Sequence, residues 1–267
     1  MPVARNSHPR WSAKRTDLSA NLLGKRAFVT GGGTGIGKAV ALALADAGAD
    51  VVITGRREEP LKEVAAENSR IAWHVMDVTN ERDVVDAIAS AGQIDIMVPN
   101  AGIAETAPMH RMTLDFWRKV QATNVEGVML CTREVIRPMA ERGWGRIIII
   151  SSIAGLGGFA YGGAYCASKH AVLGMMKCAA EEVLKTGVTV NAICPGYVAT
   201  PIIDRSIENI MGKAKISKEE ALASLRDTNP FGRLIEPDEV AAAALWLCGP
   251  GSGAVTAQSI PISGGQV

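Results

Sequence analysis

The sequence is poor in aromatic residues and carries almost no net charge. Aromatic side chains make up 4% of the 267 residues, and 28 Lys and Arg offset 27 Asp and Glu to leave a formal charge of +1. This balance argues against a nucleic-acid-binding protein, which normally carries a surplus of basic residues to neutralise phosphates. Because hydrophobic residues reach 48%, the composition also argues against intrinsic disorder, which goes with low hydrophobicity and high net charge.

Long apolar runs are also missing from the sequence. The isoleucines at 147–150 form a run of strand length, and nothing approaches the ~18–20 apolar residues that span a bilayer. Residues 1–22 contain four basic side chains before Asp17 but no apolar stretch of the kind found in secretory signals. We expect residues 1–22 to form a flexible N-terminal extension, with a transit peptide as the alternative.

Paired cysteines and clustered histidines are lacking too. The five cysteines are an odd number without a CxxC pair, and the four histidines lie far from one another. This pattern predicts reduced, mostly buried thiols in a cytoplasmic protein, and it predicts no metal site.

Glycine, by contrast, is abundant. The 28 glycines among 267 residues amount to about 10%, against a usual ~7%. More than half of them fall in three clusters, at 31–37, 155–163 and 249–265. Such clustering indicates positions at which only glycine fits, rather than a generally loose chain.

Short β-branched runs alternate with helical patterns along the chain. Strands are predicted at 25–30, 50–55, 71–78, 94–102, 146–152, 188–196 and 258–263, with helices between them. Continuous apolar runs suit strands buried on both faces, and strands separated by helices imply right-handed crossovers. The sequence therefore predicts an α/β fold with a doubly wound parallel sheet of seven strands, helices on both faces, and one domain over 23–267. Residues 201–228 interrupt the alternation with a helical pattern, and we expect them to form a lid.

The first glycine cluster lies between a predicted strand and a predicted helix. Glycines there let the backbone approach a pyrophosphate, and the helix N-terminus offers it free N–H groups. A triphosphate-binding loop is the alternative, because 32–38 fits the GxxxxGK pattern, but Ala39 replaces the hydroxyl residue that binds Mg²⁺. A purely structural turn would not require five glycines in seven positions. The loop is therefore predicted to bind a dinucleotide.

The end of the second predicted strand indicates which dinucleotide is preferred. An acidic residue about 20 positions after the loop favours NAD, whereas an arginine favours the 2′-phosphate of NADP. Here the strand ends in Thr54-Gly55-Arg56-Arg57, without an acid. We expect NADP(H) to be preferred through Arg56, with NAD(H) possible. The alternative is that both arginines are solvated residues at the start of a charged helix.

Tyr165 and Lys169 lie four residues apart and therefore share one face of a predicted helix. Tyrosine, with an ordinary pKa of about 10, exchanges protons poorly near neutrality, and a neighbouring ammonium is expected to lower that pKa. The pair could serve as general acid or base. Ser152 lies upstream at the end of a predicted strand, at the sheet edge where ligands bind in this architecture.

Together these pieces resemble the short-chain dehydrogenase/reductase family. The matching segments occur in the family's order over about residues 24–265: TGGGTGIG at 30–37, DV at 77–78, NAG at 100–102, Asn124, Ser152, YCASK at 165–169 and PGYVAT at 195–200. The resemblance implies a Rossmann-like fold, a homotetramer, and an NAD(P)-dependent oxidoreductase that transfers hydride between nicotinamide and a carbonyl or secondary alcohol. The family has a second asparagine where this sequence has Pro99, so the geometry after the fourth strand is expected to differ.

The resemblance also implies roles for individual residues. Tyr165 would be the catalytic acid/base, and Lys169 would bind the nicotinamide ribose and lower the pKa of the tyrosine. Ser152 would hold the substrate oxygen, and Asn124 would support a water molecule in a proton relay. The residues expected to bind the cofactor are Gly31, Gly33, Thr34, Gly35, Ile36, Gly37, Arg56, Asp77, Val78, Asn100, Ala101, Gly102, Tyr165, Lys169, Pro195, Gly196, Val198 and Thr200.

The substrate is less sharply indicated. The final third, 229–265, resembles ketoreductases of aromatic polyketide synthesis and 3-oxoacyl thioester reductases, which implies a 3-oxoacyl thioester or a polyketide-like ketone. A free secondary alcohol, sugar or steroid is the alternative, and a non-catalytic nucleotide-binding regulator is an alternative of another class. The expected lining of the substrate pocket is Ile153, Gly155, Phe159, Tyr161, Tyr197, Ile202 and Ile203.

Overall fold

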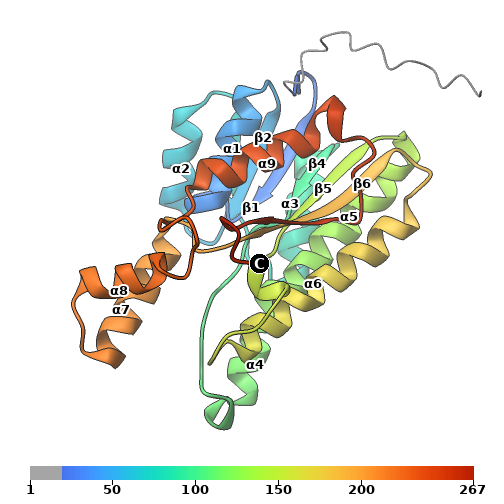
Figure 1. The fold of residues 1–267 in the computed structure, drawn as a ribbon. Helices are drawn as coiled ribbons and strands as arrows, with labels where there is room; N and C mark the ends of the chain where they lie inside the picture. The colour runs from blue at the N-terminus through green and yellow to red at the C-terminus, as the bar shows by residue number, and fades with distance from the viewer. Residues whose placement is uncertain (1–19) are drawn as a thin grey trace, which may run out of the picture.

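The computed structural model describes residues 20–267, apart from several side chains between 202 and 214. Within this range, seven parallel strands form one sheet in the order β3-β2-β1-β4-β5-β6-β7 (Figure 1). This arrangement confirms the predicted doubly wound sheet, because the chain winds outward from β1 to β3 and then returns to continue from β4 to β7. The strands are β1 Arg26–Thr30, β2 Asp50–Gly55, β3 Ile71–Val75, β4 Ile96–Val98, β5 Gly145–Ile150, β6 Val188–Pro195 and β7 Ser259–Ile262.

Helices cover both faces of the sheet, and each face has its own hydrophobic core. The helices α1, α2 and α9 pack on one face, and α3, α5 and α6 pack on the other (Figure 1). Neighbouring residues of β1 point to opposite cores, Phe28 to the second and Val29 to the first. The helices are α1 Gly35–Asp46, α2 Glu58–Glu67, α3 Glu81–Ala91, α4 Leu114–Gln121, α5 Gly127–Arg142, α6 Gly163–Glu182, α7 Pro201–Ala214, α8 Lys218–Arg226 and α9 Pro237–Cys248.

The central strands are buried along their whole length, as their largely apolar sequences predict. Every residue of β5 and of β6 is buried. The fourth strand is shorter than the predicted 94–102, because Pro99 has no N–H to continue the ladder. The carbonyl of Pro99 still accepts a hydrogen bond from the Ile150 amide at 3.0 Å, so the chain after β4 stays bonded to β5 at this point.

The helical stretch predicted over 113–142 is not one continuous α-helix. A π-helical turn, Ala122–Glu126, separates α4 from α5. Such turns widen the helix by one residue and occur frequently at functional sites. The sequence shows no proline or glycine within 122–126 that would announce this turn.

The helical pattern predicted over 201–228 is present as α7 and α8, which project from the body beside the start of α9 (Figure 1). Their role as a lid stays a prediction, and we call the two helices the lid for brevity. The two helices enclose a small apolar cluster that includes Ile203, Ile207, Ala221 and Leu225. After α8 the chain returns to the body, where Ile235 forms a parallel β-bridge with Val198. This bridge joins the segments that enter and leave the two helices.

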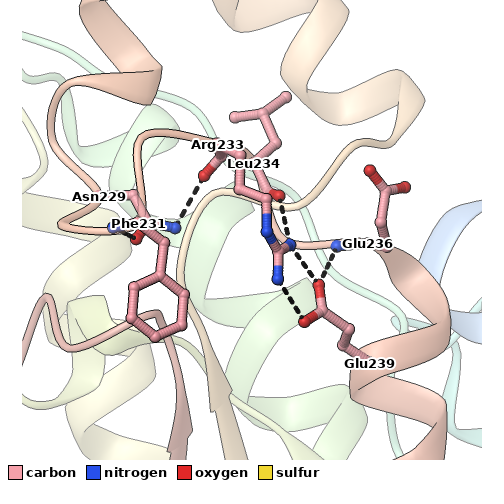
Figure 2. A network of polar contacts seen from close by, with 6 residues as sticks. All are labelled: Asn229, Phe231, Arg233, Leu234, Glu236 and Glu239. Atoms are coloured by element: carbon pink, nitrogen blue, oxygen red, sulfur yellow. Dashed lines mark hydrogen bonds and ion pairs between the residues drawn. The ribbon is translucent and has the colours of Figure 1, made fainter.

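The segment that follows the lid is fixed by a polar network (Figure 2). The two terminal guanidinium nitrogens of Arg233 donate to the Glu239 carboxylate, at 2.6 and 2.8 Å, and the Glu236 amide donates to the same carboxylate. These hydrogen bonds, the one from Arg233 above all, hold the pKa of Glu239 at about 2. Asn229 accepts from the Phe231 amide and donates to the Arg233 carbonyl, which shapes the turn.

The predicted N-terminal extension, 1–22, lies largely outside the described residues. Leu22 is part of the first core at 2% exposure, so the packed domain reaches at least one residue further than the predicted boundary at 23. Among residues 20–267, no helix is long and apolar enough to cross a membrane, and no His, Cys, Asp and Glu side chains gather as a metal site would require. The cysteines are free, and Cys131, Cys194 and Cys248 are buried.

Candidate active site

A cleft of about 380 Å³ opens at the carboxyl edge of the sheet. It lies where β1 and β4 are neighbours, which is the point at which the strand order reverses. Loops after β1, β2, β4 and β5 contribute to its walls together with α6 and the start of α7. The glycine loop and the tyrosine–lysine pair, which are far apart in the sequence, therefore face one space.

The glycine loop is shaped for close contact with a ligand. Gly31 and Gly35 have φ angles of +65° and +55°, a conformation that favours glycine. A Cβ atom at Gly37 would lie 2.3 Å from the Gly31 carbonyl oxygen, so no larger residue fits there. The loop ends at the N-terminus of α1, where free backbone N–H groups suit an anion such as a pyrophosphate.

Asn100 ties the glycine loop to the loop after β4. Its side-chain amide donates to the carbonyls of Thr30 and Gly31, at 2.8 and 3.3 Å. The hydroxyl of Thr30 in turn accepts from the backbone amides of Asn100 and Ala101, both at 2.9 Å. Pro99 was expected to alter the geometry after the fourth strand. The structure shows a shorter β4, while Asn100 keeps its hydrogen bonds to Thr30 and Gly31.

Charged and polar residues flank the cleft on the β2 side. Arg56 and Arg57 follow β2, are both exposed, and line the cleft. Asp77 also lines it, and its carboxylate accepts from the Thr79 amide and hydroxyl at 3.0 and 2.8 Å. Val78 lines the cleft and packs closely against Gly127 of α5. This side of the cleft thus offers two exposed cations and an apolar wall.

Tyr165 and Lys169 lie on the opposite side of the cleft, on one face of α6. The Lys169 ammonium is 5.7 Å from the centre of the Tyr165 ring and donates to the Ile150 carbonyl at 3.0 Å. Burial lowers the pKa of Lys169 to about 8 and raises the pKa of Tyr165 to about 12. At neutral pH the lysine is therefore mainly an ammonium and the tyrosine is a phenol.

This result corrects the expectation that Lys169 lowers the pKa of Tyr165. The phenol is only partly open to the cleft, and the loss of solvation penalises the phenolate more than its surroundings stabilise it. The group that lowers the tyrosine pKa is the hydroxyl of Ser152. Tyr165 therefore keeps its phenolic proton at neutral pH.

Ser152 begins a short 3₁₀ turn, Ile153–Gly155, immediately after β5. Its hydroxyl accepts from the Ala154 amide at 3.1 Å, which fixes the side chain beside Tyr165. The preceding hydroxyl, of Ser151, donates to the Lys169 carbonyl at 3.2 Å. Both serines thus bind the end of β5 to the helix that carries the tyrosine and the lysine.

Asn124 lies inside the π-helical turn and is buried. Its amide oxygen accepts from the Ile103 amide, and its nitrogen donates to the Ile103 carbonyl, both at 2.9 Å. The same nitrogen donates to the Ser168 hydroxyl at 3.0 Å, and that hydroxyl donates to the Tyr165 carbonyl at 2.7 Å. Asn124 therefore connects the loop after β4 with α6 at the tyrosine itself.

Most of the predicted cofactor residues line the cleft, and four do not. Gly37 is part of the packing under the glycine loop, while the other three follow or end β6. The lining residues among those predicted are Gly31, Gly33, Thr34, Gly35, Ile36, Arg56, Asp77, Val78, Asn100, Ala101, Gly102, Tyr165, Lys169 and Thr200, and those that do not line the cleft are Gly37, Pro195, Gly196 and Val198.

The predicted substrate residues are more scattered. Gly155 packs against the Lys169 backbone, where a Cβ atom would lie 2.8 Å from the carbonyl oxygen, so it is a packing position rather than a pocket wall. Ile203 is buried in the lid cluster, and Tyr197 packs against that cluster. Phe159 and Tyr161 are exposed, and Ile153 is partly buried. The side chain of Ile202 lies outside the described residues.

Several residues that hold the site together were not singled out from the sequence. Thr30, Ser151 and Ser168 anchor neighbouring loops through their hydroxyls. Ser168 lies within the YCASK segment, and Ser151 precedes Ser152, so both were within reach of the motif argument. Pro60, Met76 and Ile103 also line the cleft, but their apolar side chains give no sequence signal beyond ordinary core packing.

Comparisons with known proteins agree with this geometry. A family model described as short chain dehydrogenase matches residues 25–210. The acetoacetyl-CoA reductase of Rhizobium meliloti (strain 1021) is 37% identical over 244 residues, which cover 90% of this chain and 97% of the relative. The D-beta-hydroxybutyrate dehydrogenase of the same strain is 33% identical over 252 residues, which cover 90% of this chain and 98% of the relative.

The structural comparison extends the likeness to the whole fold. A crystal structure of a variant of the actinorhodin polyketide ketoreductase with NADPH matches with a TM-score of 0.87 and 35% identity, and covers 91% of this chain and 97% of that chain. Sequence, fold and the arrangement of the cleft lead to the same assignment. The chain belongs to the short-chain dehydrogenase/reductase family of oxidoreductases.

Proposed function

We propose that this chain reduces the carbonyl of a 3-oxoacyl thioester or a polyketide-like ketone, with NADPH as the preferred cofactor. The observation that carries the proposal is that Tyr165 and Lys169 face the same cleft as the glycine loop and Arg56. The proposed proton donor and the proposed dinucleotide-binding loop thus line the same cleft, as coupled transfer of a hydride and a proton to one carbonyl requires.

The cleft fits a dinucleotide in shape and in chemistry. Gly31, Gly35 and the N-terminus of α1 would hold the pyrophosphate. Both glycines have a positive φ, and a Cβ atom at either would lie about 3.0 Å from a neighbouring loop, so the loop keeps this shape only with glycine. Asp77 and Val78 would flank the adenine, and Lys169 would bind the ribose of the nicotinamide. The bound nicotinamide supplies the hydride.

The protein's own residues position the carbonyl and deliver the proton. Tyr165 donates its phenolic proton to the carbonyl oxygen as the carbonyl carbon is reduced, and the Ser152 hydroxyl holds that oxygen. A phenol with a pKa of about 12 is fully protonated at neutral pH and is ready to act as an acid. Asn124 keeps the tyrosine helix in place through Ser168, and its part in a water relay stays a prediction.

The preference for NADPH rests on the side chains that follow β2. Arg56 and Arg57 are exposed cations at the cleft, and no acid stands at the end of β2 to bind a ribose 2′-hydroxyl. The structural relative with NADPH supports this direction. Measured kcat/KM values with NADPH and NADH decide the point, and equal values or better values with NADH would contradict it.

The proposed substrate class follows from the relatives. An acetoacetyl-CoA reductase and a polyketide ketoreductase, both matched over more than nine-tenths of their length, act on 3-oxoacyl or polyketide carbonyls by their names. The likeness to a D-beta-hydroxybutyrate dehydrogenase favours a second candidate, the dehydrogenation of a free secondary alcohol. Acetoacetyl-CoA with NADPH and 3-hydroxybutyrate with NADP⁺, assayed side by side, separate the two.

The catalytic assignment is tested by Tyr165→Phe, which removes only the phenolic hydroxyl. We expect kcat with acetoacetyl-CoA to fall by about 10²–10⁴-fold, the usual contribution of a positioned general acid. The dissociation constant for NADPH, measured by fluorescence titration of the same variant, should stay near that of the wild type. A variant that retains its turnover would refute the role of Tyr165.

We also propose that the protein is a cytoplasmic homotetramer, as is usual in its family. Exposed apolar side chains on α4, α5 and α9, namely Leu114, Trp117, Met129 and Trp246, are suited to contacts between subunits. Sedimentation equilibrium of the purified protein measures the assembly directly.

A further inference from the structure

Residues 263–267 follow β7 at the carboxyl edge of the sheet, and we call them the tail (Figure 1). The ladder between β6 and β7 ends with Pro195 opposite Ile262, so the tail adds no pair to the sheet. Gly264 and Gly265 have φ angles of +61° and +84°, in the region that favours glycine. The chain therefore turns sharply after β7 instead of continuing as a strand.

The tail lies against the start of the loop 196–200, which leads from β6 to the lid. The Gly196 amide donates to the Ile262 carbonyl at 3.0 Å. A Cβ atom at Gly196 would lie 3.3 Å from the Gln266 side-chain oxygen and 3.4 Å from the Ser263 Cβ atom. Ser263 is buried. The tail thus supports this loop directly from the side of β7.

The Gln266 side chain contacts Gly196 by packing and not by a polar bond. Its oxygen is buried and, among residues 20–267, receives no hydrogen bond. A buried acceptor without a donor destabilises the folded protein. The contribution of this side chain to the loop therefore lies in its size and position.

A second contact joins the tail to the turn through which the chain returns from the lid. A Cβ atom at Gly264 would clash with the Asn229 side-chain oxygen, and one at Gly265 would lie 3.9 Å from the Pro230 ring. Asn229 shapes this turn through its bonds to the Phe231 amide and the Arg233 carbonyl (Figure 2). The tail thus packs on both the entry to the lid and the exit from it.

The entry and the exit are bonded to each other and reach the cofactor cleft. The Ile235 amide donates to the Tyr197 carbonyl at 2.8 Å, and the Ala199 amide donates to the Ile235 carbonyl at 2.9 Å. The entry loop ends at Thr200, which lines the cleft. A Cβ atom at Gly35 would lie 3.0 Å from the Thr200 methyl carbon. This loop is therefore held between the tail on one side and the glycine loop on the other.

We propose that the tail positions the cofactor-binding wall of the cleft, and that Gln266 and Gly264 are its positioning residues. They act through the loop 196–200, which keeps Thr200 against the glycine loop. The inference rests on the proposed function in taking NADPH as the ligand of the cleft. No tail residue lines the cleft, so the effect on the cofactor passes through the loop and not through direct contact.

The variants separate the packing of the tail from its polar groups. Gln266→Ala removes the side chain behind Gly196, whereas Gln266→Met keeps its length and removes the unpaired oxygen. Gly264→Ala introduces the clash with Asn229 and strains a positive φ. The controls are Val267→Ala, at an exposed position of the tail, and Gly253→Ala, which has open space around it.

Three measurements follow each variant: the Kd for NADPH by fluorescence titration, hydrogen exchange of the Gly196 and Ala199 amides without NADPH, and kcat with acetoacetyl-CoA at saturating NADPH. We expect Gln266→Ala and Gly264→Ala to raise the Kd about 3–30-fold and to speed exchange of both amides. The kcat should stay near the wild-type value, because Tyr165 and Ser152 are untouched. Gln266→Met and both controls should match the wild type in Kd and exchange.

Several results would overturn the inference. An unchanged Kd in Gln266→Ala, or an equal rise in Val267→Ala, would show that the tail does not position the wall. Equal losses in NADPH affinity, kcat and melting temperature would reduce its role to general folding. A changed assembly state in sedimentation would assign the effect to a subunit contact.

Failure of the proposed function gives a different result. A wild-type protein that binds NADPH but does not reduce acetoacetyl-CoA would refute the proposed substrate, while the Kd and exchange data would still decide the role of the tail. A wild-type protein that does not bind NADPH would refute both.

Discussion

Replacing Lys169 by methionine should make the protein more stable while it abolishes catalysis. Burial lowers the pKa of Lys169 from 10.5 to about 8, so the folded state disfavours the ammonium. At 1.36 kcal/mol per pH unit, this difference destabilises the folded protein by about 3 kcal/mol wherever the lysine is charged in both states. Methionine has a similar unbranched shape and no charge, so Lys169→Met removes that cost.

One loss offsets part of the gain. The variant leaves the Ile150 carbonyl without the hydrogen bond that it receives from Lys169 at 3.0 Å, which costs about 1 kcal/mol. A net gain of about 2 kcal/mol raises the melting temperature by about 4–8 °C in a domain of this size.

The pH dependence gives the sharper test, because the sign of the effect is fixed. Below pH 8 the lysine is charged in both folded and unfolded states, and the full destabilisation is present. As pH rises from about 8 to 10.5, the folded protein releases the proton first and the destabilisation disappears. The gap in melting temperature between variant and wild type should therefore be wide at pH 7 and narrow at pH 10. A variant that melts below the wild type at pH 7, or a gap that ignores pH, would refute the reasoning.

Two further substitutions test the glycine loop and the network after the lid. Gly37→Ala places a methyl group 2.3 Å from the Gly31 carbonyl oxygen. We expect it to lower the free energy of unfolding, measured with denaturant, by about 1–3 kcal/mol and to weaken NADPH binding. Gly174→Ala is the control, because Gly174 has open space around it, and it should change neither quantity in that direction. Glu239→Gln removes the partner of Arg233, whose hydrogen bond lowers the pKa of Glu239 to about 2. Because that pair is well exposed, its contribution is at most about 1 kcal/mol. This stabilisation is present above pH 4.5 and is lost as pH falls toward 2. The difference in melting temperature between the wild type and Glu239→Gln should therefore shrink between pH 5 and pH 3. A difference that stays constant over this range would count against the pairing.

The sheet was predictable because its strands are apolar on both faces. Apolar runs such as 147–150 predict strands that are buried on both faces, and the helices between the strands predict parallel crossovers. The glycine loop and the tyrosine–lysine pair were predictable for a similar local reason, since their spacing fixes which groups share a face. The order of the strands then brings them to one cleft without further information.

The electrostatics of the site and its supporting contacts could not be predicted in the same way. The sequence shows Lys169 near Tyr165 and so suggests a lowered tyrosine pKa, but burial, a property of the folded chain alone, raises it. The π-helical turn around Asn124 depends on contacts with Ile103 and Ser168, which are distant in sequence. The contacts of residues 263–267 with Gly196 and Asn229 likewise appear only once the strands are in place.

The π-helical turn has a consequence for how this helix tolerates change in length. An α-helix advances about 100° per residue. The extra residue of the turn therefore rotates the side-chain faces of α4 by about that angle relative to those of α5. Deleting one residue within 122–126 would be expected to convert the π-helical turn into regular α-helix. It would also rotate α4 by about 100° relative to the sheet, and the asparagine would leave its buried position. The position of Asn124 thus depends on the extra residue of the turn as well as on its own identity. A sequence alignment that puts a gap elsewhere in this helix would match Asn124 to the wrong residue.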